Sequence, residues 1–339
     1  TGVGKTGVVG LLEGAQPGPT ILLRFDIDAL PITEETGVEY ASTVPGVMHA
    51  CGHDAHVATG LTVARLLSQV RGDLKGQVKF MFQPAEEGLG GAVAMMADGV
   101  LDSPAPEACF SLHVWNDLPI GWMGIAPGPV MAGAGRFTVK VTGRGGHGAQ
   151  PQTTLDPIVA GAQIVTAMQS LVSRNISPLD SAVVSIAQFH AGEAFNVIPQ
   201  FAELKGTIRT FDPGVRQRVF QRFTEIAQGI ARAMGCQADV ELAETTPPVV
   251  NDARVTEHVV KSAECLFPND HIDQAYQTMG SEDMAYVMQK VPGCYFFVGA
   301  KNDQLGLNYG HHHPKFDIDE AVLPRAASLM AAAAVDYLS

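Results

Sequence analysis

The segment His49–His56, His-Ala-Cys-Gly-His-Asp-Ala-His, gathers residue types that bind metal ions. Cys51 and His53 stand two residues apart, so both side chains can face one ion where the backbone is extended or turns. A thiolate and an imidazole together suit a borderline-soft ion such as Zn²⁺. The alternative interpretation is a free, buried cysteine followed by a helix that Asp54 caps. The segment alone leaves both interpretations open.

Three further segments carry residues of the same kinds. They are the pair Glu86 and Glu87 after an apolar run, His113 inside another apolar run, and the adjacent residues His311, His312 and His313. In an extended backbone successive side chains point to opposite sides, so one glutamate could bind metal while the other faces a substrate. Each segment also has an interpretation without a metal ion. The glutamates could lie in a solvated loop, His113 could be a core histidine, and the three adjacent histidines could lie on the surface. Together with the first segment they favour a metal centre of one or two ions.

Two phosphate-binding patterns near the start of the chain are rejected. Gly2–Gly7 matches the dinucleotide pattern G-x-G-x-x-G, and Gly4-Lys5-Thr6 matches the tail of a P-loop. Both motifs function only between a strand and a helix N-terminus, where backbone N–H groups meet the phosphate. Here the strand-like segment Val8–Leu12 follows. We therefore interpret the glycines as a turn between strands.

The candidate ligands need a fold that brings them together, and composition bounds that fold. The chain has 339 residues, of which 46% are hydrophobic and 17% charged, which predicts two folded domains. The formal net charge of −13 excludes a nucleic-acid binder and a basic membrane-surface protein, since both need a basic face. No apolar run approaches the ~20 residues of a membrane helix, and no signal-peptide pattern is visible. With five scattered cysteines, these features predict a cytoplasmic protein with free thiols.

Strand-like and helix-like segments alternate in the first and last parts of the chain. Short apolar runs predict strands at Val8–Leu12, Ile21–Phe25, Val78–Phe82, Cys109–Val114 and Tyr295–Val298. Helical patterns fit residues 54–70, 89–98, 252–266 and 320–338. Such alternation is typical of an α/β domain.

The middle of the chain has a different pattern. Strands are predicted at Arg136–Thr142, Ala182–Phe189, Ala202–Thr210 and Ala238–Leu242, and helices at Leu155–Val172 and 214–234. The resulting order, βαββαβ, is the split-βαβ pattern of a small α+β sandwich. The sequence therefore predicts a domain of residues 133–243, inserted into an α/β domain of residues 1–132 and 244–339.

Seven segments, taken in order along the chain, resemble those of a known family. They are Leu23–Pro31, Met48–Asp54, Gln83–Gly88, Gly143–Pro151, Asn196–Pro199, Gly206–Arg209 and Gly280–Asp283. With them the chain resembles the metal-dependent N-acyl-amino-acid amidohydrolases, in the hippurate hydrolase and auxin-conjugate hydrolase branch of the aminoacylase/carboxypeptidase superfamily. The resemblance spans nearly the whole chain. Family members carry a further N-terminal helix and strand. The resemblance therefore implies that this sequence is a piece of a longer chain.

The resemblance implies a di-metal peptidase-like catalytic domain, a mixed sheet flanked by helices, with an inserted ferredoxin-like lid and dimerisation domain. It implies two divalent ions per chain, with zinc favoured over manganese, cobalt or nickel. Carried over position by position, the ligands are Cys51, His53, Glu87, His113 and His312. His312 is chosen because the family's ligand lies two residues before the proline, here Pro314, although His311 and His313 stay open. Asp28 would orient the centre, and Asp26 replaces a ligand histidine of other branches.

The implied reaction is hydrolysis of the amide bond of N-acyl or N-aroyl amino acids, which releases a carboxylic acid and an amino acid. Glu86 would be the general base for a metal-activated water. His147, from a second subunit, would polarise the scissile carbonyl. Asn196 and Arg209 would hold the free carboxylate of the substrate, since the arginine fork offers two parallel donors. The implied assembly is a homodimer or homotetramer through the inserted domain.

Other functions stay open. A metallo-carboxypeptidase for short or N-blocked peptides and a deacetylase of the N-acetyl-diaminopimelate type would need the same centre. A non-catalytic metal-binding protein is an alternative of another class. Glu86 beside Glu87 speaks against it, because a ligand site needs only one of them. A nucleotide-binding function would rest on Gly2–Gly7 alone.

Overall fold

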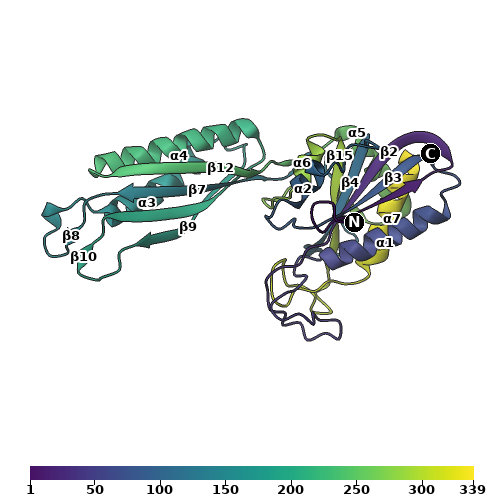
Figure 1. The fold of residues 1–339 in the computed structure, drawn as a ribbon, viewed down its shortest axis with the longest axis horizontal. Helices are drawn as coiled ribbons and strands as arrows, with labels where there is room; N and C mark the ends of the chain where they lie inside the picture. The colour runs from purple at the N-terminus through teal and green to yellow at the C-terminus, as the bar shows by residue number, and fades with distance from the viewer. The chain divides into compact units, whose positions relative to one another are not determined.

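The computed structural model describes residues 1–339, and the contacts within it divide the chain into two compact units (Figure 1). Unit 1 comprises residues 1–130, 249–277 and 282–339, and unit 2 comprises residues 131–248 and 278–281. Unit 2 is therefore almost entirely one continuous stretch of chain that interrupts unit 1. None of the helices combines the length and the apolar character needed to cross a membrane.

Seven strands form the sheet of unit 1, in the order β1-β3-β2-β4-β15-β5-β14. In chain order they are β1 (Val8–Glu13), β2 (Gln16–Asp26), β3 (Lys75–Gln83), β4 (Ala108–Pro119), β5 (Trp122–Gly124), β14 (His271–Asp273) and β15 (Gly293–Lys301). β2 pairs in parallel with β3 and β4, and β4 with β15, whereas β1 pairs antiparallel with β3. The sheet is therefore mixed, and its four central strands all end toward the same edge.

Helices flank this sheet. They are α1 (His53–Gln69), α2 (Gly91–Ala97), α5 (Ala253–Leu266), α6 (Met284–Met288) and α7 (Val322–Tyr337), and a short pair of strands, β6 (Gly128–Met131) and β13 (Val249–Asn251), accompanies them. Helix α7 contacts both α1 and α5. Leu22 and Leu23 of β2 point to opposite faces and are both fully buried, so both faces of the sheet are covered.

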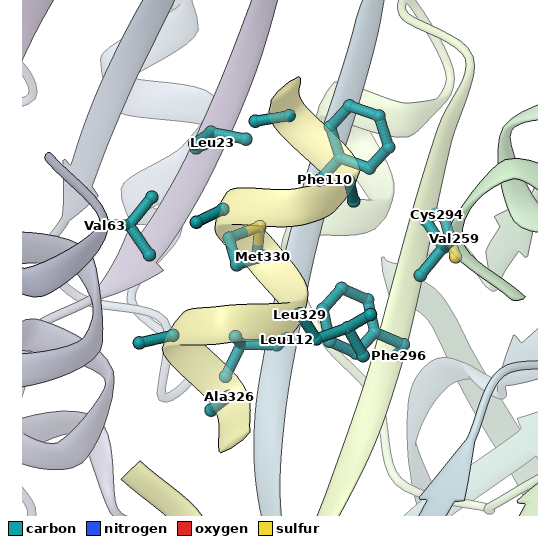
Figure 2. Packing of buried hydrophobic residues seen from close by; sticks show 14 of the residues in the cluster. Leu23, Val63, Phe110, Leu112, Val259, Cys294, Phe296, Ala326, Leu329 and Met330 are labelled. Carbon is teal, nitrogen blue, oxygen red and sulfur yellow. The ribbon is translucent and has the colours of Figure 1, made fainter. Parts of the chain in front are cut away.

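The main hydrophobic core lies between α7 and the sheet. Figure 2 shows Leu329 and Met330 of α7 among Val63 of α1, Phe110 of β4 and Phe296 of β15. Fully burying a large apolar side chain stabilises a fold by about 1.5–3 kcal/mol. This core makes the helix layer and the central strands one rigid support for the loops that follow the strands.

Unit 2 is a four-stranded antiparallel sheet, in the order β12-β7-β11-β9, packed against two helices. Its elements are β7 (Gly133–Thr142), α3 (Pro157–Asn175), β9 (Ala182–Ala191), β11 (Phe201–Thr210), α4 (Pro213–Ala233) and β12 (Gln237–Thr246). A separate ribbon pairs β8 (Gly146–His147) with β10 (Val197–Ile198), and one 3-10 turn spans Pro151–Thr153. The order β7-α3-β9-β11-α4-β12 confirms the predicted βαββαβ pattern of an α+β, ferredoxin-like fold.

Both helices of unit 2 start with the same local signal. Asp156 accepts hydrogen bonds from the N–H groups of Ile158 and Val159 and thereby caps α3. Asp212 caps α4 in the same way, through the N–H of Val215. A proline follows each aspartate at the first helical position, where its missing N–H costs nothing.

Helix α1 does not begin with Asp54 as its capping residue, which is one expectation from the sequence. Its N-cap residue is Gly52, which has a φ of 83° and makes no side-chain cap hydrogen bond. Asp54 lies inside the first turn, so the expectation that it caps the helix is wrong. Gly52 adopts a left-handed conformation that favours glycine, and it turns the chain so that Cys51 and His53 flank it. Two candidate ligands, Cys51 and His53, therefore lie at the start of this helix.

Candidate metal centre

Cys51, His53, Glu87, His113 and His312, the five predicted ligands, all belong to unit 1. Cys51 and His53 flank the start of α1, Glu87 lies in the turn after β3, His113 lies on β4, and His312 precedes α7. In α/β sheets, side chains at and beyond the carboxyl ends of parallel strands converge on one edge. This topology explains how segments far apart in the sequence reach one place.

The five side chains surround the thiol of Cys51. Candidate ligand atoms of Cys51, His53 and His113 lie within 4.8 Å of one another, and the same holds for Cys51, Glu87 and His312. Cys51 Sγ is 3.5 Å from His113 Nε2. His312 Nε2 is 3.0 Å from Glu87 Oε1. Because Cys51 belongs to both groups, the structure brings all five residues together.

Two buried histidines are oriented by hydrogen bonds from Nδ1. His53 donates to the main-chain oxygen of Asp28 at 3.1 Å, and His113 donates to that of Val114 at 2.6 Å. Each bond places the proton on Nδ1 and leaves a lone pair on Nε2, the arrangement found in metal-ligating histidines. His53 Nε2 is buried and has no hydrogen-bond partner. An orphaned nitrogen among thiol, imidazole and carboxylate groups fits a divalent ion such as zinc.

Asp28 links two of the ligand segments. Its Oδ2 accepts the N–H of Glu87 at 3.1 Å, and its Oδ1 lies 3.3 Å from His53 Nδ1. Burial alone would raise the pKa of Asp28, but hydrogen bonds from His53 and the main chain of Glu87 lower it. An ionised Asp28 therefore fixes the ring of His53 and the turn that carries Glu87.

The adjacent glutamates lie in a turn rather than in the expected extended stretch. Ala85, just before them, has a φ of 57°, in the left-handed region. Glu87 faces Cys51 and His312, whereas Glu86 lies within 4.8 Å of Glu282 and Asp283. The two carboxylates nevertheless approach each other in this turn, because candidate ligand atoms of His53, Glu86 and Glu87 lie within 4.8 Å of one another. Burial and the Glu282 carboxylate raise the pKa of Glu86 well above its usual value.

A buried ion network, which the sequence did not predict, supports Glu86. Arg24 is fully buried, and its guanidinium donates to both carboxylate oxygens of Glu282 at 2.7 and 3.1 Å and to Asp26 at 2.7 Å. Tyr295 donates its hydroxyl to Glu282 at 2.8 Å. Arg24 and Glu282 lie in two of the family-like segments, but they are 258 positions apart and no spacing connects them. Arg24 thus stabilises the carboxylate that faces Glu86.

His56 is a second side chain whose role the sequence did not reveal. It is fully buried, donates from Nδ1 to Asp26, and accepts the N–H of Val114 at Nε2 at 3.0 Å. Both nitrogens are occupied, so His56 holds Asp26 in place, 3.7 Å from His53 Nε2. Its spacing from His53, three residues along one helix, was the available signal.

Negatively charged carboxylates surround His53. Burial lowers the pKa of His53, but the carboxylates of Asp26 and Asp28 outweigh this and raise it to about 9. Burial and the nearby Glu87 raise the pKa of Cys51. A cation bound here would replace the protons on Cys51 and His53 as the positive charge that balances these carboxylates. It would therefore favour the thiolate and the neutral imidazole.

The three adjacent histidines take different directions. His312 has a φ of 68°, its N–H donates to Ala50 at 2.7 Å, and its ring faces Glu87. The ring of His313 stacks on Tyr309 at 4.4 Å. His311 points inward, and burial together with neighbouring histidines lowers its pKa to about 3. The backbone therefore presents only His312 to Glu87.

The three remaining predicted residues belong to unit 2. His147 on β8 pairs with Val197 on β10, and the oxygen of Asn196 accepts the N–H of Gly148 at 2.8 Å. His147 and Asn196 therefore lie together at one tip of this unit. Gly143 donates to the oxygen of Gln200, which places the tip beside the start of β11.

Arg209 lies near the other end of β11. It is paired with Ala134 and Val183, and its guanidinium donates to Ser281 at 3.0 Å. The strand from Phe201 to Arg209 covers about 26 Å at ~3.3 Å per residue. Within unit 2 the structure therefore brings His147 together with Asn196 and separates both from Arg209.

Comparisons with known proteins agree with this geometry. The model of peptidase family M20/M25/M40 matches residues 22–336. An N-acetylcysteine deacetylase of Bacillus subtilis is 43% identical over 335 residues, 98% of this chain and 86% of the relative. Thermostable carboxypeptidase 1 of Saccharolobus solfataricus is 39% identical over 340 residues, 99% of this chain and 85% of the relative. The crystal structure of the Bacillus subtilis YXEP protein, described as a dinuclear metal-binding peptidase of the M20 family, is similar with a TM-score of 0.85 and 39% identity, over 98% of this chain and 85% of that one.

Proposed function

Because this chain belongs to peptidase family M20/M25/M40 and is a metal-dependent hydrolase, we propose that it hydrolyses the amide bond of N-acyl or N-aroyl amino acids. The products are a carboxylic acid and a free amino acid. The observation that carries the proposal is the position of Glu86, a partly buried carboxylate beside the cluster of five candidate metal-ligand side chains. A relative named for deacetylation of N-acetylcysteine supports this substrate class.

Five side chains would hold two divalent ions: Cys51, His53, Glu87, His113 and His312. The thiolate favours zinc, and the nitrogen and oxygen ligands also suit manganese, cobalt or nickel. When bound, the ions supply polarisation of the scissile carbonyl and a lowered pKa of the attacking water. Asp28 and His56 keep the ligand side chains in position through their hydrogen bonds.

Glu86 would act as the general base and then as the general acid. It accepts a proton from the water as the new C–O bond forms, and it delivers that proton to the leaving amine as the C–N bond breaks. Its raised pKa, which burial and Glu282 cause, suits a group that must both take and release a proton. General acid–base catalysis of this kind contributes about 10²–10⁴-fold.

Arg209 and Asn196 would hold the free carboxylate of the substrate, and His147 would polarise the scissile carbonyl. A separation of about 26 Å along β11 is longer than an N-acyl amino acid, so one copy of unit 2 cannot place all three around one substrate. We therefore assign His147 and Asn196 to a site in a second copy of the chain.

Exposed apolar side chains on unit 2 support association of two copies. Phe189, Phe195 and Phe201 expose 38%, 104% and 51% of their surface, on or near the edge strand β9. An edge strand with unpaired N–H and C=O groups and neighbouring exposed aromatics is suited to pairing with another chain. A homodimer or homotetramer through unit 2 is the assembly we propose.

The test combines metal analysis with a change of Glu86. In Glu86→Gln we expect unchanged metal content and a fall in kcat of about 10²–10⁴-fold, because the amide cannot accept the proton. Glu13→Gln, at an exposed position on β1, is the matched control. Unchanged hydrolysis by Glu86→Gln would remove Glu86 as the base.

A substrate panel separates this function from its alternatives. N-benzoylglycine, N-acetyl amino acids and Gly-X dipeptides would be assayed with and without a chelator. Preference for the dipeptides would favour a carboxypeptidase, the function for which one relative is named. Stoichiometric metal without turnover of any substrate would favour a non-catalytic metal-binding protein.

A further inference from the structure

His311 lies at the metal centre but outside the proposed ligand set. Its Nδ1 is 3.7 Å from Cys51 Sγ. Its Nε2 accepts the main-chain N–H of Asn116 at 3.2 Å. A main-chain N–H can only donate, so Nε2 carries the lone pair and Nδ1 the proton of a neutral ring. His311 therefore presents a donor, rather than a ligand atom, to the sulfur.

Packing holds the ring in this orientation. The rings of Trp115, Phe316 and His113 lie 4.9, 5.0 and 5.1 Å from it, centroid to centroid. A flip of the ring would break the bond to Asn116 and leave a partly buried N–H unpaired. The adjacent N–H of His312 is bonded to Ala50 at 2.7 Å, which fixes the backbone beside Cys51.

We propose that His311 is a positioning residue that donates a hydrogen bond to the Cys51 thiolate and limits the negative charge which the sulfur gives to a bound ion. The inference rests on the proposed ligation by Cys51. Hydrogen bonds to a ligating sulfur stabilise its charge and tune the electronic properties of the metal. Cys51 could then supply the affinity of a thiolate while the ion keeps its ability to polarise a carbonyl. The run of three histidines would thus contain a donor, a ligand and a surface residue.

Cobalt(II) is the probe for this role. A thiolate bound to cobalt gives a charge-transfer absorption band, and the band moves to lower energy when the sulfur becomes more electron-rich. His311→Gln places an amide near the position of Nε2 and removes the donor at Nδ1. His311→Asn places an amide N–H near Nδ1 and removes the acceptor at Nε2. The pair separates the bond to the sulfur from the bond to Asn116.

We expect the band of His311→Gln to move to lower energy, and that of His311→Asn to stay near the wild-type position. Cobalt content per chain should be the same in both variants. His313→Gln is the matched control, because His313 stacks on Tyr309 and makes no contact with Cys51. Circular dichroism verifies the fold of each protein. If His311→Gln does not fold, His311→Phe keeps the ring packing, lacks the donor and must show the same shift.

Three results would overturn the inference. A band that His311→Gln leaves in place would show that the ring does not act on the sulfur, and it would leave the proposed function untouched. Equal loss of one ion from both amide variants would make His311 a ligand. A wild-type protein without any thiolate band would refute ligation by Cys51, and with it the proposed composition of the metal centre.

Discussion

Several residues of the centre are useful only because a partner fixes one of their atoms. Asn116, Val114 and the main chain at Asp28 each occupy one nitrogen of a histidine, and this decides which face of each ring is free. Tautomer and direction therefore follow from hydrogen bonds made outside the ligand set.

Arg209 offers a test of the proposed carboxylate clamp. Arg209→Lys keeps the charge but loses the fork that binds a carboxylate through two parallel bonds. Hydrogen bonds to charged groups contribute ~1.5–3 kcal/mol each, so we expect KM to rise about 10–100-fold with a smaller change in kcat. Steady-state kinetics on an N-acyl amino acid would measure this, and the matching C-terminal amide should show no such difference. An equal effect on both substrates would contradict the clamp.

Arg24 is the residue on which the buried network depends. Arg24→Met leaves Asp26, Glu282 and Asp283 buried without their cation, which costs about 3–5 kcal/mol. Urea denaturation would measure the loss. Arg71→Met, at an exposed site, is the control and should change the free energy of unfolding by less than ~0.5 kcal/mol. A small loss for Arg24→Met would show that water or protons compensate these carboxylates.

At the scale of elements, the centre depends on how helices and strands begin and end. The left-handed Gly52 starts α1 between Cys51 and His53, and the left-handed Ala85 turns the chain after β3. The Gly52 segment precedes helix α1, and the Ala85 segment follows strand β3. The core therefore anchors each segment at one end. The candidate ligands Cys51 and Glu87 thus lie on short turns held by rigid elements, while His53 and His113 lie on such elements, an arrangement that favours precise geometry.

The helices of unit 2 pack through a core separate from that of unit 1. Phe223 of α4 is fully buried and lies 4.5 Å from Phe137 of β7, between ring centroids. We expect Phe223→Ala to cost about 3–5 kcal/mol, through lost burial and the cavity that remains. The change should lower the unfolding temperature of unit 2 while cobalt binding by unit 1 persists.

Differential scanning calorimetry, with cobalt absorption as the second readout, would check this prediction. Leu179→Ala is the control, because Leu179 is 94% exposed and its truncation removes almost no buried surface. Loss of metal binding in Phe223→Ala would show that the two units do not fold independently.

At the scale of the whole molecule, metal binding should stabilise the fold. The buried His53 Nε2 has no hydrogen-bond partner in the folded chain and gains one when a cation binds. At a free zinc concentration of 100 times Kd, the gain is about 2.7 kcal/mol. Thermal unfolding with zinc and with a chelator would measure it. Cys51→Ala should lose most of the effect, whereas Cys265→Ala, at an exposed cysteine, should retain it.

Mixing two inactive variants tests whether a site is shared between copies. His147→Ala lacks the residue supplied to the partner, and Glu86→Gln lacks the base. In a mixed dimer, the intact Glu86 of one chain meets the intact His147 of the other. Random pairing should therefore restore about a quarter of wild-type activity, since half of the dimers are mixed and each has one intact site. No recovery after verified exchange of subunits would assign His147 to its own chain.

The residue types of the candidate ligands and the order of the long elements follow from local features of the sequence. Apolar runs and helical periodicity are local, and they predicted the strands around Ile21–Phe25 and Cys109–Val114 and the βαββαβ pattern of unit 2. Strands of three residues, such as β5, β13 and β14, escaped prediction because so few residues show no alternation. Patterns of apolar residues therefore predict a strand or helix well when it is long enough for the pattern to repeat.

Which atoms meet in the centre depends on contacts that form when the chain folds. The crossovers of a parallel sheet bring Arg24 to Glu282 across 258 positions, and no local pattern specifies such a contact. A turn at the left-handed Ala85, rather than strand alternation, brings both Glu86 and Glu87 close to His53. The direction of each of the three adjacent histidines likewise follows from a hydrogen bond or a ring contact made by the folded chain. Residue type is a local property, whereas ligand direction depends on partners that folding brings from elsewhere.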